Sequence, residues 1–114
     1  MVNITTDQDD AYHVIKVSGD IDASSSIFLD EAISDALDQN CNKIIIDCQE
    51  LNYISSAGLG VFMSYIEEFK TRKVRLALFG LNDKVLNVFQ ILGLDQLLQI
   101  VETRDKAKIL IDEV

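Results

Sequence analysis

The stretch that most constrains this fold runs from Leu51 to Phe62 and reads LNYISSAGLGVF. Shortly before it lies the β-branched run Lys43–Asp47 (KIIID), which is typical of a strand covered on both faces. After it, apolar residues recur at spacings of three and four, which predicts a helix with one buried face. The adjacent hydroxyl groups of Ser55 and Ser56 therefore lie where a strand ends and a helix begins.

The start of a helix is a distinctive place for a hydroxyl group. The first backbone N–H groups have no partner within the helix, and the aligned peptide dipoles make that end partly positive. A serine there commonly caps the helix, which contributes about 1 kcal/mol. A phosphorylated serine is also favoured there, and its charge of about −1.5 to −2 would act on a bound partner more than on folding. The residues alone leave both interpretations of Ser55 and Ser56 open.

Strand and helix patterns alternate along the rest of the chain. Strands are predicted at about 2–6, 11–17, 43–48, 74–79 and 97–101, with an acidic turn at 7–10, and helices at about 27–39, 59–69, 81–92 and after Thr103. The apolar stripe of the first helix is assigned to Ile27, Phe28, Leu29, Ala32, Ile33, Ala36 and Leu37. The candidate caps are Asp22, Ser24 or Ser25 for the first helix, Asn82 or Asp83 for the third, and Thr103 for the last, with Asn40 and Gly93 as helix stops.

This alternation predicts an α/β fold in one domain, residues 1–114, with a central mixed sheet of four to five strands and four helices. The second helix contains Phe62 and Met63, which are either core residues or partner contacts. The absence of proline and of low-complexity segments agrees with one unit.

The charge is −9 and lies in the first half of the chain. Residues 1–50 hold eleven acidic and two basic side chains, whereas residues 51–114 hold eight of each. This balance argues against binding to nucleic acid, which needs a basic surface, and favours either a basic partner or a solvated face. We expect a cytoplasmic protein with no membrane attachment, because no apolar run is long enough to span a bilayer and no signal peptide is evident.

The sequence contains no motif that supports a metal site or a catalytic site. Cys41 and Cys48 are poorly spaced for a zinc site or a disulfide, and His13 is the only histidine, so no metal and no cofactor are expected. Gly58-Leu-Gly60 is not followed by a third glycine, no P-loop lysine is present, and no G-x-S-x-G elbow surrounds Ser56. The prediction is a binding protein and not an enzyme; a small hydrolase with Ser56 as nucleophile is the alternative.

Three motifs resemble those of the bacterial anti-sigma factor antagonists, small members of the STAS superfamily. They are Gly19–Asp22 (GDID), Ile44–Asp47 (IIID) and, most specific, Tyr53–Val61 (YISSAGLGV), joined by Ile91–Leu94 (ILGL). The resemblance implies a STAS-like fold and partner switching. The unphosphorylated antagonist binds an anti-sigma factor that is also a serine kinase, a sigma factor is released, phosphorylation dissociates the complex, and a serine phosphatase resets it.

The resemblance implies that Ser56 is the phosphate acceptor, with Ser55 as second choice. Family members commonly carry Asp at the position of Ser55, so this chain lacks a carboxylate beside the acceptor. The expected partner-binding residues are Asp20, Asp22, Ser24, Ser55, Ala57, Gly58, Leu59 and Gly60, on a protein expected to be a monomer. For Asp22, a cap of the first helix is an equal alternative. The alternative function is a STAS interaction module in another signalling or lipid-transport pathway, without phosphorylation.

Overall fold

The computed structural model describes residues 2–113 and contains one sheet and four α-helices. The elements in chain order are β1 (Val2–Asp9), β2 (Tyr12–Ile21), α1 (Ser26–Asp38), β3 (Lys43–Ile54), α2 (Ser56–Thr71), β4 (Arg75–Phe79), α3 (Asp83–Ile91), the short 3-10 helix η1 (Leu94–Gln96), β5 (Gln99–Val101) and α4 (Arg104–Asp112). The predicted α/β class, with a mixed sheet of up to five strands and four helices, is confirmed.

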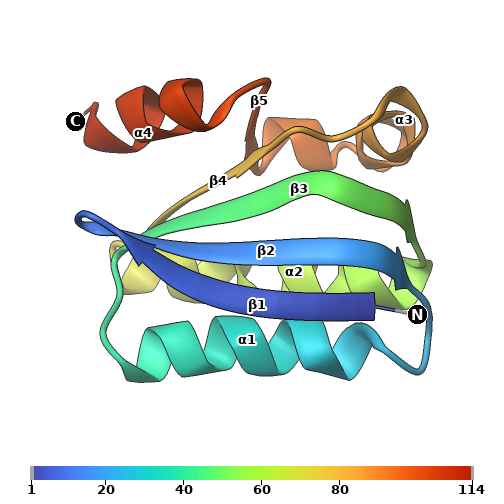
Figure 1. The fold of residues 1–114 in the computed structure, drawn as a ribbon, viewed down its shortest axis with the longest axis horizontal. Coiled ribbons are helices and arrows are strands. Elements are labelled where there is room, and N and C mark those ends of the chain that lie inside the picture. Colours follow the sequence, from blue (N-terminus) through green and yellow to red (C-terminus); the bar gives the residue numbers. More distant parts are fainter. Residues whose placement is uncertain (1, 114) are drawn as a thin grey trace.

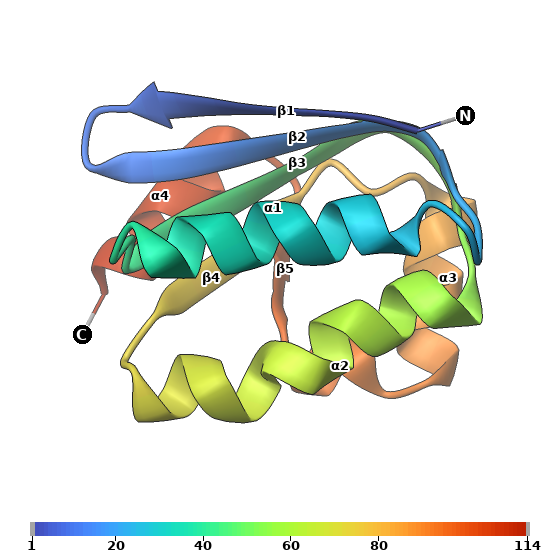
Figure 2. The same ribbon diagram turned by 90° about the horizontal axis from the view of Figure 1, so that it is seen from below.

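The five strands lie side by side in sequence order, β1-β2-β3-β4-β5. β1 and β2 form an antiparallel hairpin, and every later neighbour pair is parallel. Figure 1 shows α4 on one side of the sheet and α1 and α2 on the other. Figure 2 shows α1 and α2 next to each other, both beginning at the same end of the sheet. Strand ends and helix starts that are far apart in sequence therefore meet at that end.

The central strand β3 is buried from both sides. Ile44 and Ile46 pack into the larger core under α1 and α2, while Ile45 packs into the smaller core under α4. All three side chains are fully buried. The prediction that this β-branched run is a doubly covered strand is confirmed.

Strands β1, β2 and β3 are longer than the sequence predicted, whereas β4 and β5 are shorter than the predicted 74–79 and 97–101. β3 was expected to end at Cys48 and continues to Ile54, because its pairing with β2 resumes after two register shifts and reaches the pair Ile21↔Ile54. Polar residues at 49, 50 and 52 interrupt the apolar run, but all three are exposed while Leu51 and Ile54 are buried. The acidic turn predicted at 7–10 is also shorter, since β1 continues to Asp9 and the left-handed residue of the turn is Asp10.

Most predicted helix boundaries are confirmed. Asn40 has a positive φ of 59° just after α1, and Gly93 has a φ of 72° after α3. The Asn82 side chain accepts a hydrogen bond from the Val85 N–H at 2.8 Å, so Asn82 caps α3. Thr103 caps α4 in the same way, through the Lys106 N–H at 3.2 Å.

Candidate functional site

The connection between β3 and α2 is a single residue, Ser55. Its backbone is extended (φ −82°, ψ 170°), and its Oγ accepts a hydrogen bond from the Gly58 N–H at 3.2 Å. Its own N–H donates to the Ile21 carbonyl at the end of β2, at 2.8 Å. Ser55 is therefore the N-cap of α2 and also ties the start of that helix to the neighbouring strand.

Ser56 is the first residue of α2 and is exposed. Within residues 2–113 its side chain has no hydrogen-bond partner, because Ser55 already performs the capping role. The first turn of α2 contains no acidic residue. The free hydroxyl of Ser56 thus lies at the partly positive end of a helix of 16 residues, where an added anion is stabilised.

Gly58 brings the start of α2 close to the strands. A Cβ atom there would lie 2.8 Å from Ile21 Cγ2 and 2.8 Å from Ile54 Cγ1, which is closer than such atoms pack. At Gly60, in contrast, a Cβ would meet nothing within 4 Å. Gly58 is therefore a packing requirement, whereas Gly60 leaves an open, half-exposed surface next to Ser56.

The expected partner-binding residues of α2 divide by burial. Ala57 is exposed, and Ser55 and Gly60 are half-exposed. Gly58 is buried, and Leu59 is only 2% exposed in the core under α2. Because a docked protein contacts exposed atoms, the side chain of Leu59 is not part of the surface that surrounds Ser56.

The loop between β2 and α1 lies beside this junction, since Asp20 and Ile21 pair with Tyr53 and Ile54. The Asp22 carboxylate in this loop accepts hydrogen bonds from Ser25 Oγ and the Ser25 N–H, both at 2.8 Å, and from Ser24 Oγ at 2.9 Å. These bonds lower the pKa of Asp22 to about 2, with the Ser25 hydroxyl as the largest cause.

Of the three candidate caps for α1, Ser25 occupies the N-cap position, but its side chain does not cap a helix N–H. Its Oγ accepts a hydrogen bond from the Asp22 N–H instead, at 2.8 Å. The loop is thus closed by reciprocal bonds between Asp22 and Ser25. Asp22 is exposed and shapes the surface near Ser56, but its carboxylate is occupied by the loop itself.

Four large apolar side chains are exposed on the elements that form this end of the molecule. Tyr53 is 46% exposed on β3, Met63 is 52% exposed on α2, and Ile27 and Phe28 are 54% and 52% exposed in the first turn of α1. Placing Ile27 and Phe28 in the buried stripe of the first helix was wrong. Three consecutive helical residues point in directions about 100° apart, so they cannot all face the core, and Leu29 takes that place. This periodicity was the signal available in the sequence.

On α2, the choice between core and surface is resolved for Phe62 and Met63. Phe62 is buried and its ring lies 6.0 Å from that of Phe89, whereas Met63 is exposed. Met63 follows Ser56 by seven residues, and two helical turns bring such residues to the same face. The α2 face that carries Ser56 therefore also carries Gly60 and Met63. The loop at Asp20–Ser25 lies beside the start of this helix, and Tyr53 lies on β3 two residues before Ser55.

The only histidine of the sequence, the usual base beside a serine nucleophile, lies far from Ser56. His13 is buried in β2, and burial lowers its pKa. It precedes Ile21 by eight strand residues, roughly 25 Å along β2, so it lies at the opposite end of the sheet. No group of His, Cys, Asp and Glu that could hold a metal ion occurs in the part of the chain that the structure describes. Both cysteines are free thiols there, with Cys48 buried as predicted.

The model of the STAS domain family matches residues 3–107, which is most of the chain. The chain belongs to the STAS domain family. It is 33% identical over 100 residues to the anti-sigma-B factor antagonist of Listeria monocytogenes, an alignment that covers 87% of this chain and 88% of that protein. The resemblance to STAS proteins that the motifs GDID, IIID and YISSAGLGV indicated is therefore confirmed.

Solved structures support the same fold for this STAS domain. An anti-sigma factor antagonist from Mycobacterium paratuberculosis superposes with a TM-score of 0.90 at 19% identity, covering 99% of this chain and 96% of that one. The Bacillus cell fate determinant SpoIIAA in its phosphorylated form superposes with a TM-score of 0.71 at 22% identity, covering 96% and 99%. Among residues 2–113, no helix has the length and apolar character needed to cross a membrane.

Proposed function

We propose that this STAS domain is an anti-sigma factor antagonist that works by partner switching, with Ser56 as the phosphorylated residue. The proposal rests on the different roles of two adjacent serines. Ser55 caps α2, whereas the hydroxyl group of Ser56 is exposed and has no hydrogen-bond partner within residues 2–113. The curated relative from Listeria monocytogenes is an anti-sigma-B factor antagonist, and SpoIIAA was solved in a phosphorylated form. Both agree with this assignment.

In the unphosphorylated state, the surface around Ser56 binds an anti-sigma factor that is also a serine kinase. Tyr53 and Met63 offer exposed apolar area for this contact, and aromatic and methionine side chains are enriched at such interfaces. The acidic first half of the chain favours a partner with a basic surface. Binding displaces the sigma factor from the kinase, which releases it for transcription.

The kinase then transfers the γ-phosphoryl group of its ATP to Ser56 Oγ: the bond between the γ-phosphorus and the β-phosphate oxygen breaks, ADP leaves, and the hydroxyl proton passes to a base of the kinase. The new phosphate carries a charge of about −1.5 to −2 and finds N–H donors at the start of α2, so the fold tolerates it. The interface with the kinase does not tolerate the phosphate, because it formed around a neutral hydroxyl group. The complex dissociates, and a serine phosphatase restores the starting state.

Ser56 is preferred over Ser55 because the Ser55 hydroxyl is half-buried and already accepts the Gly58 N–H. The chain acts by binding, as a cytoplasmic monomer with no cofactor and no catalytic step of its own. The hydrolase alternative lacks a Ser–His pair, since His13, the only histidine, lies at the other end of the sheet from Ser56.

The test is the intact mass of the protein purified from its own host, followed by fragmentation of the peptide that spans residues 44–70. We expect a mass increment of one phosphate, placed on Ser56. A phosphate on Ser55 would agree with partner switching but would show that Ser55, and not Ser56, is the phosphorylated residue. The absence of any increment under every growth condition would contradict the proposal and favour a STAS module that works without phosphorylation.

A further inference from the structure

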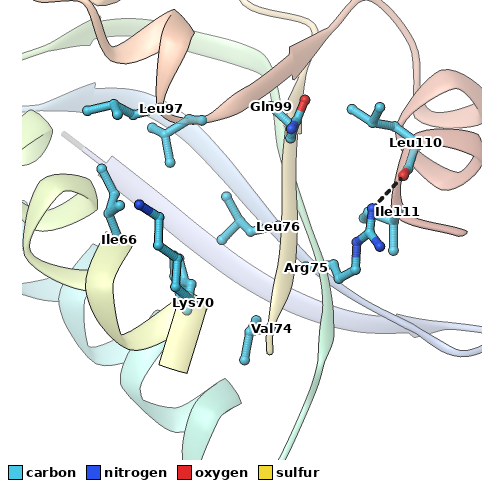
Figure 3. Close-up of a pocket in the computed structure, with 11 residues that line it drawn as sticks. Ile66, Lys70, Val74, Arg75, Leu76, Leu97, Gln99, Leu110 and Ile111 are labelled. Atoms are coloured by element: carbon cyan, nitrogen blue, oxygen red, sulfur yellow. Dashed lines mark hydrogen bonds between the residues drawn. The ribbon is translucent and has the colours of Figure 1, made fainter. Parts of the chain in front are cut away.

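A cavity of about 180 Å³ lies at the open edge of the sheet, between the end of α2 and α4. It exists because β5 is only three residues long and pairs with β4 from Ala77 to Phe79. Arg75 and Leu76, at the start of β4, therefore have no strand beside them on that edge. Figure 3 shows Leu76 in the middle of the cavity, with Leu97 and Gln99 at one end.

The edge cavity is half open, and its lining combines apolar side chains with polar side-chain and backbone groups. Most of its lining side chains are apolar, and Leu97 at its rim is 57% exposed. No aspartate or glutamate lines it. Apolar walls with few polar groups are typical of small-molecule sites, in which those polar groups orient the ligand.

The polar groups of the edge cavity are cationic. Six of the ten Lys and Arg side chains form salt bridges with carboxylates, namely Lys16, Lys43, Arg72, Arg104, Lys106 and Lys108. Within residues 2–113, Lys70, Lys73, Lys84 and Arg75 form none. Two of these four, Lys70 and Arg75, line the edge cavity. A chain with a net charge of −9 therefore places two of the cations without a salt bridge around one cavity.

The two cations lie on opposite sides of the β4 edge (Figure 3). Arg75 donates a hydrogen bond to the Leu110 carbonyl at 3.2 Å, which holds its guanidinium group against α4. Lys70 extends from the last turn of α2 along the wall formed by Ile66 and Leu97. Its ammonium group is the one that a ligand in the cavity can reach without displacing a bond of the fold.

We propose that the edge cavity binds a small carboxylic acid with an apolar body of about six carbon atoms. The carboxylate pairs with Lys70, and the body lies against Leu76 and Leu97. The volume of about 180 Å³ fits this class, because about 150 Å³ is enough space for a benzene molecule. Ser56 is 14 residues from Lys70 on the same helix, roughly 21 Å away, so this site is separate from the proposed switch.

The test is a titration of the ¹⁵N-labelled protein with hexanoate at constant ionic strength, followed by amide chemical shifts. We expect saturable shifts at Leu76, Leu97 and Gln99 and none at Ser56. Acetate should bind at least about tenfold more weakly, since each buried methylene contributes about 0.8 kcal/mol. Hexanol, which has the body without the charge, should bind about fivefold more weakly, as expected for a partly exposed ion pair.

The matched variants are Lys70→Gln and Lys73→Gln, which each remove one exposed, unpaired cation close to the end of α2. We expect Lys70→Gln to weaken hexanoate binding about fivefold and Lys73→Gln to leave it unchanged. The proposal is overturned if hexanoate causes no saturable shift, if hexanol binds as tightly, or if both variants behave alike. Shifts of the same amides with protein concentration alone would assign the cavity to a second copy of the chain and would also overturn it.

Discussion

Two helices of this protein begin with adjacent serines at the end of a parallel strand, and the two clusters differ in how far their hydroxyl groups are used. At the start of α1, Ser24 and Ser25 donate to the Asp22 carboxylate, and Ser26 donates to the Ala23 carbonyl. At the start of α2, Ser55 accepts a hydrogen bond from the Gly58 N–H, and the Ser56 hydroxyl has no partner within residues 2–113. In the α1 cluster the Asp22 carboxylate engages both Ser24 and Ser25. No acidic residue lies in the first turn of α2, and the comparison shows how the second serine of that cluster stays available for modification.

The largest expected effect concerns the free hydroxyl. Ser56→Asp should weaken binding of the kinase partner at least about 30-fold, because it places an unpaired charge in the interface. The thermal midpoint should hardly change, since an acidic side chain is favoured in the first turn of a helix. Calorimetry of binding and of unfolding measures both quantities. Ser56→Ala is the control; it should bind normally and resist release by ATP. An unchanged affinity of Ser56→Asp would contradict the mechanism.

The next effect concerns the packing that holds the α2 cluster against the strands. Gly58→Ala should lower the free energy of unfolding by about 1–3 kcal/mol, because the new methyl group meets Ile21 and Ile54 at 2.8 Å. Gly60→Ala is the matched control in the same helix. It should raise the free energy of unfolding by about 0.5–1 kcal/mol, since alanine favours helix and the space is open. Urea denaturation compares the two, and equal effects would show that the close approach at Gly58 is not a constraint.

A smaller effect separates the two serines of the α2 cluster directly. Ser55→Ala removes the hydrogen bond to the Gly58 N–H and should cost about 1 kcal/mol of stability. Ser56→Ala removes no hydrogen bond within residues 2–113 and should change stability by less than about 0.5 kcal/mol. Both values come from urea denaturation at one pH. If Ser56→Ala is as destabilised as Ser55→Ala, Ser56 contributes to the cap and its hydroxyl is not free.

The smallest effect concerns the acidic neighbour in the α1 cluster. Because hydrogen bonds from Ser25 and Ser24 lower the pKa of Asp22 from 3.8 to about 2, the folded state binds this proton less readily than the unfolded chain. The stabilisation by Asp22 is therefore present above pH 3.8 and is lost as the pH falls towards 2.

Native protein and Asp22→Ala should accordingly differ most in stability near neutral pH and converge between pH 4 and 2, as measured by thermal unfolding at each pH. Glu31→Ala is the control, because its exposed side chain on α1 forms no hydrogen bond in residues 2–113. A difference between native protein and Asp22→Ala that stays constant over this range would show that the carboxylate acts through packing and not through its charge.

Much of the architecture follows from the sequence. The β-branched run of β3, the spacing of apolar residues in α2, and the caps Asn82 and Thr103 are local signals, and each lies where it was predicted. The exposure of Ile27 and Phe28 and the continuation of β3 to Ile54 were missed. In both cases the contact that decides the outcome comes from another part of the chain: the core that selects Leu29, and the pairing with β2.

The sequence by itself determined the α/β order, the family motifs and the position of the candidate phosphorylation site at the start of the second helix, because these depend on neighbouring residues and on periodicity. Only the tertiary structure decided which serine caps α2, that Asp22 is occupied by its own loop, and that Leu59 is buried while Met63 is exposed. The reason is physical. A hydroxyl or a side chain is available to a partner only when no atom of the fold already satisfies or covers it, and Ile21 and Phe89 reach this site from distant parts of the chain.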